Sequence, residues 1–345
     1  MAPENGQAKK PDLAWVGTLV GMGMLGLAGG ILYQAFQRYD MAEVARSMRA
    51  IPGQRVGMAL ACVVLSYLFQ TAYDFLALLS IHRRASAVRA ALAAFVSNAF
   101  TNNIGFSPLT ATSLRFRFYS VWGYRPLEIA QVIALSKLSF FTGLLDFAGV
   151  LQIVAPASWP PALEPRLPMR WLGAALLLPG AVLLGANLLH PGRPLRLGKY
   201  RLCRPASWLL VLQAATASLS FAFSALTLLF LLPGAAFAEA LNGLGTTLFI
   251  STFMAAKVGS LLLPVPGSLG VLEGTVLIMF SPFLDDYPLL GGLLAYRLLF
   301  YLAPFGAAVI LLAAFEAAAR LGRWHGKAPS RTQGNTGADP GKLLV

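Results

Sequence analysis

The sequence has little charge and almost no cysteine or histidine. Only 12% of its 345 residues are charged, and it contains two cysteines and three histidines. Cys62 lies in an apolar run and Cys203 in a basic loop, so neither a disulfide framework nor a metal-ligand spacing is visible. All three histidines lie in expected loops, without the spacing of a catalytic triad. We therefore expect no metal, no cofactor and no enzymatic activity.

Apolar residues dominate instead. They make up 57% of the chain, in several runs of 20 or more residues, which indicates an all-α polytopic integral membrane protein. We expect a short cytoplasmic N-terminus at 1–12, one transmembrane domain at 13–320 and a disordered cytoplasmic tail at 321–345. The expected spans are 13–36, 56–80, 126–154, 171–189, 206–232 and 288–316, with broken segments at 90–123 and 239–284.

Basic residues outnumber acidic ones, 27 to 14, and they gather in short loops. This pattern predicts orientation by the positive-inside rule and gives no reason to expect nucleic acid as a partner. The loop 193–204 and both termini should be cytoplasmic, whereas the segments around Pro233 and Asp285 should face outward. One loop conflicts with this scheme, because 38–55 holds four arginines and yet falls outside by parity.

Two stretches of the chain repeat each other at an offset of 154 residues. Phe-Val-Ser at 95–97 recurs as Phe-Ile-Ser at 249–251, and Leu-Ser-Tyr at 65–67 recurs as Leu-Ser-Phe at 219–221. Further on, Lys137 matches Arg297 at an offset of 160. The repeats cover about 56–154 and 206–316, and three expected spans separate the two broken segments. An odd number of spans predicts inverted-topology repeats, each with a re-entrant helical hairpin.

The broken segments carry polar groups that lipid would not tolerate. Pro108 interrupts the first and Pro264 the second, and nine hydroxyl or amide side chains lie between Ser97 and Ser113. We expect a polar cavity at this point, with the restarting helices presenting N-termini that favour an anion. The alternative is that Asn98, Asn102 and Asn103 only form hydrogen bonds between helices.

Ionisable residues at membrane depth are candidates for a functional role, because burying a charge there costs free energy. More of them are basic than acidic, which suits an anionic group passing through, although acid–base pairing without transport is the alternative. Two arginines two positions apart point about 200° apart on a helix, so only one of Arg115 and Arg117 can face a given cavity. We expect Asp74 to pair with a cation of the first repeat and Glu273 with one of the second. The candidate substrate-binding residues are Asp74, Asn98, Asn102, Asn103, Arg115, Arg117, Lys137, Lys257, Glu273 and Arg297.

Three ordered stretches also resemble a known family. Residues 95–123, 266–274 and 296–301 resemble the three motifs of the N-terminal membrane (flippase) domain of bacterial lysylphosphatidylglycerol synthetase/flippase proteins. The resemblance implies an inner-membrane protein that moves aminoacylated phosphatidylglycerol, or a related lipid, between leaflets and lowers susceptibility to cationic peptides. By motif position, Arg115, Arg117, Glu273 and Arg297 carry over as functional residues. Asp74 also carries over, but the residues around it are only generally similar to those of the family.

The chain departs from that family in having no soluble aminoacyl-transfer domain after the membrane region. We therefore expect a standalone flippase whose partners are membrane phospholipid, a separate lipid synthase and a second copy of the chain. Glycolipid, hopanoid-linked and undecaprenyl-type lipids remain open as substrates. Two other functions also remain open, a secondary transporter of a small anionic solute and a membrane-embedded lipid-modifying transferase.

Overall fold

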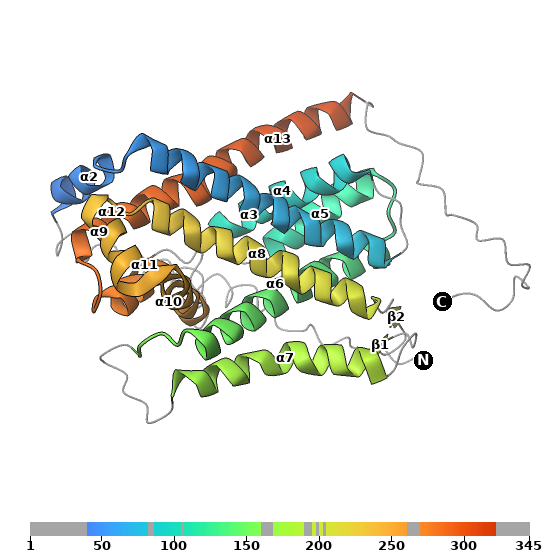
Figure 1. The fold of residues 1–345 in the computed structure, drawn as a ribbon. Helices are drawn as coiled ribbons and strands as arrows, with labels where there is room; N and C mark the ends of the chain where they lie inside the picture. Colours follow the sequence, from blue (N-terminus) through green and yellow to red (C-terminus); the bar gives the residue numbers. More distant parts are fainter. Residues whose placement is uncertain are drawn as a thin grey trace, which may run out of the picture.

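The computed structural model describes residues 40–81, 86–104, 107–159, 168–189, 195–197, 200–202, 205–260 and 270–321 (Figure 1). The expected first span at 13–36, the proline-containing break at 264–267 and the tail from 322 onward lie outside this set.

Among the described residues, five helical segments are long and apolar enough to cross a membrane, and they confirm the other predicted spans. They are α3 (Gly53–Ser80), α6 (Pro126–Val154), α7 (Met169–Leu189), α8 (Ser207–Phe230) and the continuous segment Asp286–Arg320. The last comprises α12 (Asp286–Tyr296), the π-helical turn η3 (Arg297–Leu302) and α13 (Ala303–Arg320). Large apolar side chains on these helices face outward, with Val182 65% and Ile310 70% exposed. Such a surface suits lipid, and the fold class is that of an all-α polytopic membrane protein.

Shorter elements fill the remaining described chain. They are α2 (Met41–Arg49), α4 (Ala87–Ile104), α5 (Ser107–Val121), β1 (Leu195–Leu197), β2 (Tyr200–Leu202), α9 (Gly234–Glu239), the π-helical turn η1 (Ala240–Leu244), α10 (Gly245–Ser260) and α11 (Val271–Phe280). The two strands form a small antiparallel hairpin inside the expected basic loop. Gly245 separates η1 from α10, and its φ of 76° is a conformation that favours glycine.

The arginine-rich segment 38–55 contains a helix that the sequence analysis did not predict. Asp40 caps α2 by accepting a hydrogen bond from the N–H of Ala42, and α2 packs against α12. Nearby, Arg55 donates from Nη1 to the carbonyl oxygen of Leu232 at 2.8 Å and lies 4.5 Å from the centroid of the Phe237 ring. The segment therefore lies at the same end of the bundle as Pro233, as the span count required.

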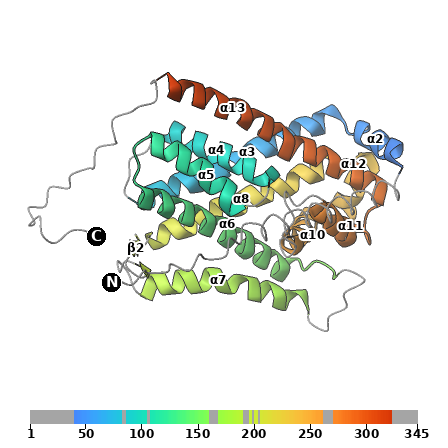
Figure 2. The same cartoon turned by 180° about the vertical axis from the view of Figure 1, so that it is seen from behind.

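The two broken segments form helical hairpins. In the first, α4 and α5 pack together with 18 and 15 residues, and in the second, α10 and α11 pack together with 16 and 10. Each arm is shorter than the roughly 20 residues that a spanning helix needs. The first hairpin follows α3 in the chain and the second follows α8. These two neighbouring helices run antiparallel, as Figures 1 and 2 show. The hairpins therefore start at opposite ends of the bundle, which confirms the predicted arrangement.

Contacts between equivalent residues confirm the internal symmetry. The ring of Phe69 stacks on that of its equivalent, Phe223, with centroids 5.7 Å apart. A second aromatic contact between the repeats occurs twice, because Phe140 and Phe300 are also equivalent, at the offset of 160. Tyr67 contacts Phe300 at 5.7 Å, and its equivalent Phe221 contacts Phe140 at 5.3 Å. These pairs place a pseudo-two-fold axis across the α3–α8 contact, perpendicular to both helices. The repeats are therefore inverted relative to each other.

Candidate binding site between the repeats

The first hairpin holds a buried ion pair. Arg115 on α5 donates from Nε and Nη2 to Oδ2 of Asp74 on α3, at 2.9 and 2.8 Å. Its Nη2 also donates to Oδ1 of Asn98 on α4, at 2.9 Å. The two charged side chains are 2% and 0% exposed. The expectation that Asp74 pairs with a cation of its own repeat is confirmed.

Within the described part of the chain, several buried polar atoms of this ion pair and of nearby residues on α4 and α5 have no hydrogen-bond partner. They are Oδ1 of Asp74, Nη1 of Arg115, Nδ2 of Asn98, Oγ of Ser97 and the hydroxyl oxygen of Tyr119. Buried polar groups are nearly always bonded to protein or to ordered water. The cluster therefore has the hydrogen-bonding capacity to hold water or a polar ligand group.

Arg117 does not belong to this interior cluster. It forms an ion pair with Glu316 on α13, donating from Nε and Nη2 at 2.8 and 2.7 Å. Its side chain is 48% exposed. The geometric expectation that Arg115 and Arg117 face different surroundings is confirmed, and Arg117 does not line the interior as a substrate-binding residue would.

The second hairpin holds its own ion pair. Arg297 at the start of η3 donates from Nη2 to Oε2 of Glu273 on α11 at 2.9 Å and from Nε to Oε1, and its guanidinium lies 5.1 Å from the centroid of the Tyr301 ring. Oε2 of Glu273 also accepts from the backbone N–H of Gly270, at 3.0 Å. The expected partner of Glu273 is confirmed. At the start of α11 the carboxylate of Glu273 therefore occupies one backbone donor itself, whereas the anion position expected at residues 267–268 lies outside the described residues.

Two asparagines of α4 donate hydrogen bonds to neighbouring helices, and one of them also bonds within α4. Nδ2 of Asn102 donates to the hydroxyl oxygen of Tyr67 at 3.2 Å. Nδ2 of Asn103 donates to the carbonyl oxygens of Ala99 at 2.9 Å and Tyr301 at 3.0 Å. Together with the Asn98–Arg115 bond, these contacts match the alternative of interhelical hydrogen bonding. The described contacts thus favour that alternative for these three amides, and the polar cavity expected at the break, which includes residues 105–106 outside the described set, stays a prediction.

Lys257 on α10 has a different environment. Its Nζ lies 3.4 Å from Oγ of Ser224, which shares a 2.7 Å hydrogen bond with the hydroxyl of Tyr296. The aromatic rings of Phe221, Phe253 and Phe300 surround the ammonium at 5.5 to 5.7 Å. Within the described part of the chain, no carboxylate forms an ion pair with it. The charge is evident from the sequence, but the surrounding cage is not, because its rings come from three separate elements.

Two further interior charges of the described residues lie on α6. Nζ of Lys137 is 6.0 Å from the centroid of the Phe140 ring. The carboxylate of Asp146 occupies the space that Gly180 on α7 leaves by having no side chain. Because Asp74 and Glu273 form ion pairs with Arg115 and Arg297, neither arginine supplies an uncompensated positive charge, and the expected positive lining by Arg115, Lys137 and Arg297 stays a prediction.

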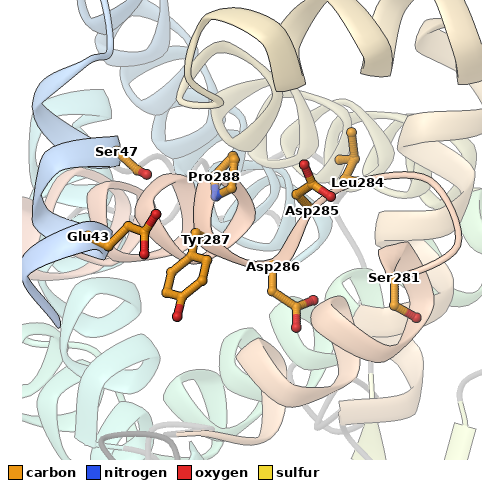
Figure 3. A pocket seen from close by; sticks show the side chains of 8 residues that line it. All are labelled: Glu43, Ser47, Ser281, Leu284, Asp285, Asp286, Tyr287 and Pro288. Atoms are coloured by element: carbon orange, nitrogen blue, oxygen red, sulfur yellow. The ribbon is translucent and has the colours of Figure 1, made fainter. Parts of the chain in front are cut away.

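A separate pocket of about 510 Å³ opens at the end of the bundle where α2 meets α12. Figure 3 shows Glu43 and Ser47 of α2 and the pair Asp285 and Asp286 around it. Among the described residues, no three acidic, histidine or cysteine side chains are arranged to hold a metal ion. This pocket could not be predicted from the sequence, because Glu43 is distant in sequence from Asp285.

The fold and the interior charges define a membrane protein built from inverted helical repeats. No family model matches the chain. It is 29% identical over 301 residues to the uncharacterized protein slr0712 of Synechocystis, covering 86% of this chain and 90% of that protein. It is also 23% identical over 290 residues to the inner membrane protein YbhN of Escherichia coli, covering 82% and 87%. The similarity to YbhN and the five membrane-length helices support a membrane location.

Proposed function

We propose that this protein moves an anionic or aminoacylated phospholipid of the phosphatidylglycerol type between the leaflets of the bacterial inner membrane. The observation that carries the proposal is the pair of hairpins that start at opposite ends of the bundle and are related by the axis between α3 and α8. In transporters with inverted repeats, the substrate site lies near the bilayer midplane at the repeat interface. The resemblance of the three sequence motifs to flippase domains supports a lipid as the substrate.

In this proposal an interior cation without a carboxylate partner among the described residues receives the phosphate, and the apolar outer faces of the helices leave the acyl chains in the bilayer. A separate synthase would supply an aminoacylated lipid, and both termini would lie in the cytoplasm. Export of lysine-bearing lipid would reduce the negative surface charge that attracts cationic peptides.

The direct test uses proteoliposomes that contain fluorescent phosphatidylglycerol in both leaflets. A membrane-impermeant reductant removes the outer-leaflet signal, and the protein should then allow the inner-leaflet signal to decay as well. Empty liposomes provide the control. A parallel assay should measure uptake of radiolabelled glycerol phosphate, a small anionic solute. Solute uptake without lipid movement would replace the lipid proposal with a secondary transporter.

A further inference from the structure

Among the described residues, Lys257 differs from Arg115, Arg117 and Arg297 in having no carboxylate partner. Arg115, Arg117 and Arg297 each form an ion pair with a carboxylate. Among the described residues, the polar contact of the Lys257 ammonium is the hydroxyl of Ser224, at a long 3.4 Å. An ammonium carries three N–H donors, so Lys257 retains the capacity to donate to an incoming acceptor.

The surroundings stabilise this charge without neutralising it. Three phenyl rings lie within 6 Å of Nζ, the range in which the negative face of an aromatic ring attracts a cation. Lys257 also lies in the last turn of α10, where the helix dipole favours positive charge. Because neither contribution supplies a full negative charge, the ammonium remains able to attract an anion.

The other repeat shows that the fold does not require a charge at this position. The equivalent of Lys257, at the offset of 154, is Asn103. Its neutral amide is satisfied by two carbonyl oxygens, those of Ala99 and Tyr301. The same element of the fold thus works in one copy with a neutral side chain whose amide nitrogen donates two hydrogen bonds. Packing alone therefore does not explain why the second copy carries an ammonium at this position.

We propose that Lys257 is the anion-binding residue of the repeat interface and that it selects a singly charged phosphate diester. The proposal rests on the proposed function for its source of phosphate, the lipid headgroup. One uncompensated positive charge matches one negative charge. A phosphate monoester would bring nearly two, and the excess charge would be costly to bury. Ser224, hydrogen-bonded to Tyr296, acts as a positioning residue for the ammonium.

The test measures binding of short-chain lipids to the purified full-length protein in detergent. The probes are dioctanoyl phosphatidylglycerol, a diester, and dioctanoyl phosphatidic acid, a monoester. Glycerophosphoglycerol, the same diester without acyl chains, shows whether a soluble headgroup is sufficient. The variants are Lys257→Met, which removes the charge at similar size, and Lys257→Arg, which keeps it. Arg170→Met is the matched control, because Arg170 is an exposed cation at the start of α7.

We expect Lys257→Met to weaken phosphatidylglycerol binding by about tenfold or more, since a charge-assisted hydrogen bond is lost. Lys257→Arg and Arg170→Met should bind as the wild type does, and phosphatidic acid should bind more weakly than phosphatidylglycerol. Unchanged melting temperatures would show that the variants are folded. Unaltered binding in Lys257→Met would overturn the assignment of the residue, and equal or tighter binding of phosphatidic acid would overturn the selectivity.

The same variants separate this inference from the proposed function. If the wild type moves no lipid in proteoliposomes but binds glycerophosphoglycerol through Lys257, the flippase proposal fails and the anion site stands. If the wild type moves lipid and Lys257→Met moves it equally fast, the anion site fails and the flippase proposal stands.

Discussion

The hydroxyl of Ser66 donates to the carbonyl oxygen of Ser220 at 2.9 Å, and the two hydroxyl oxygens are 3.1 Å apart. These two serines occupy the same position in the two repeats, 154 residues apart. A residue can contact its own equivalent only where both lie at the symmetry axis. Because α3 and α8 run antiparallel there, the axis is perpendicular to them and would lie in the plane of the membrane. The two repeats are therefore inverted copies that meet at this serine pair.

The serine contact predicts a specific cross-link. With Cys62→Ala and Cys203→Ser as the background, Ser66→Cys combined with Ser220→Cys should form a disulfide in the presence of a membrane-permeant oxidant, because the side chains already touch. The measurement is co-migration of the two halves on a non-reducing gel after cleavage at a protease site inserted between α6 and α7.

The matched control is Ser66→Cys with Ser218→Cys. Ser218 is on the same helix as Ser220, but its hydroxyl bonds the carbonyl oxygens of Gly143 and Ala214. This second pair should remain uncross-linked. Equal cross-linking of both pairs would mean that α3 and α8 do not hold the described register.

Much of the fold could be predicted from the sequence, because lipid imposes a simple rule on spanning helices. An apolar run near 30 Å long must form a helix, so the predicted bounds of α6 agree with the structure at both ends. The offset of 154 and the odd number of spans then predicted the opposed hairpins. Helix α2 was missed, because a short polar helix outside the apolar runs leaves little signal in composition.

The candidate site was less predictable, because partners are chosen by packing between distant segments. The sequence indicated that Asp74 and Glu273 need cations, but it could not show that both arginines would be neutralised as a result. The cage around Lys257 depends on Phe221 of α8 and Phe300 of η3. The π-helical turn at η3 sets which face of the chain carries Phe300, and sequence periodicity alone does not reveal such a turn.

Close packing of α6 on α8 makes Gly143 sensitive to substitution. A Cβ at this position would collide with the side chain of Ala217 and lie 3.1 Å from the carbonyl oxygen of Ala214. Gly143→Ala should therefore destabilise the protein by about 1–3 kcal/mol. Gly185→Ala is the control, because nothing lies within 4 Å of its added Cβ. Thermal unfolding in detergent should show a lower melting temperature for the first variant and an unchanged or higher one for the second.

Two arginines on α5 should differ sharply in their contribution to stability. Arg115→Met leaves the buried carboxylate of Asp74 without its partner, which costs about 3–5 kcal/mol. Arg117→Met removes a surface ion pair, which is worth about 1 kcal/mol or less. Replacing both partners, as in Asp74→Leu with Arg115→Met, should recover part of the first loss. Thermal unfolding of these variants provides the measurement, and equal losses for the two single arginine variants would contradict the burial difference.

The role of Arg297 can be separated into charge pairing and substrate contact. Arg297→Leu should reduce lipid movement in proteoliposomes while the protein stays folded, because it leaves Glu273 unpaired at the start of α11. Glu273→Gln in the same chain removes that unpaired charge and keeps an oxygen that can accept from the N–H of Gly270. Since the charge of Arg297 is already satisfied by Glu273, we expect the double variant to recover most of the lost transport. If the double variant stays as inactive as Arg297→Leu, Arg297 contacts the lipid itself, and Lys257 does not bind the phosphate alone.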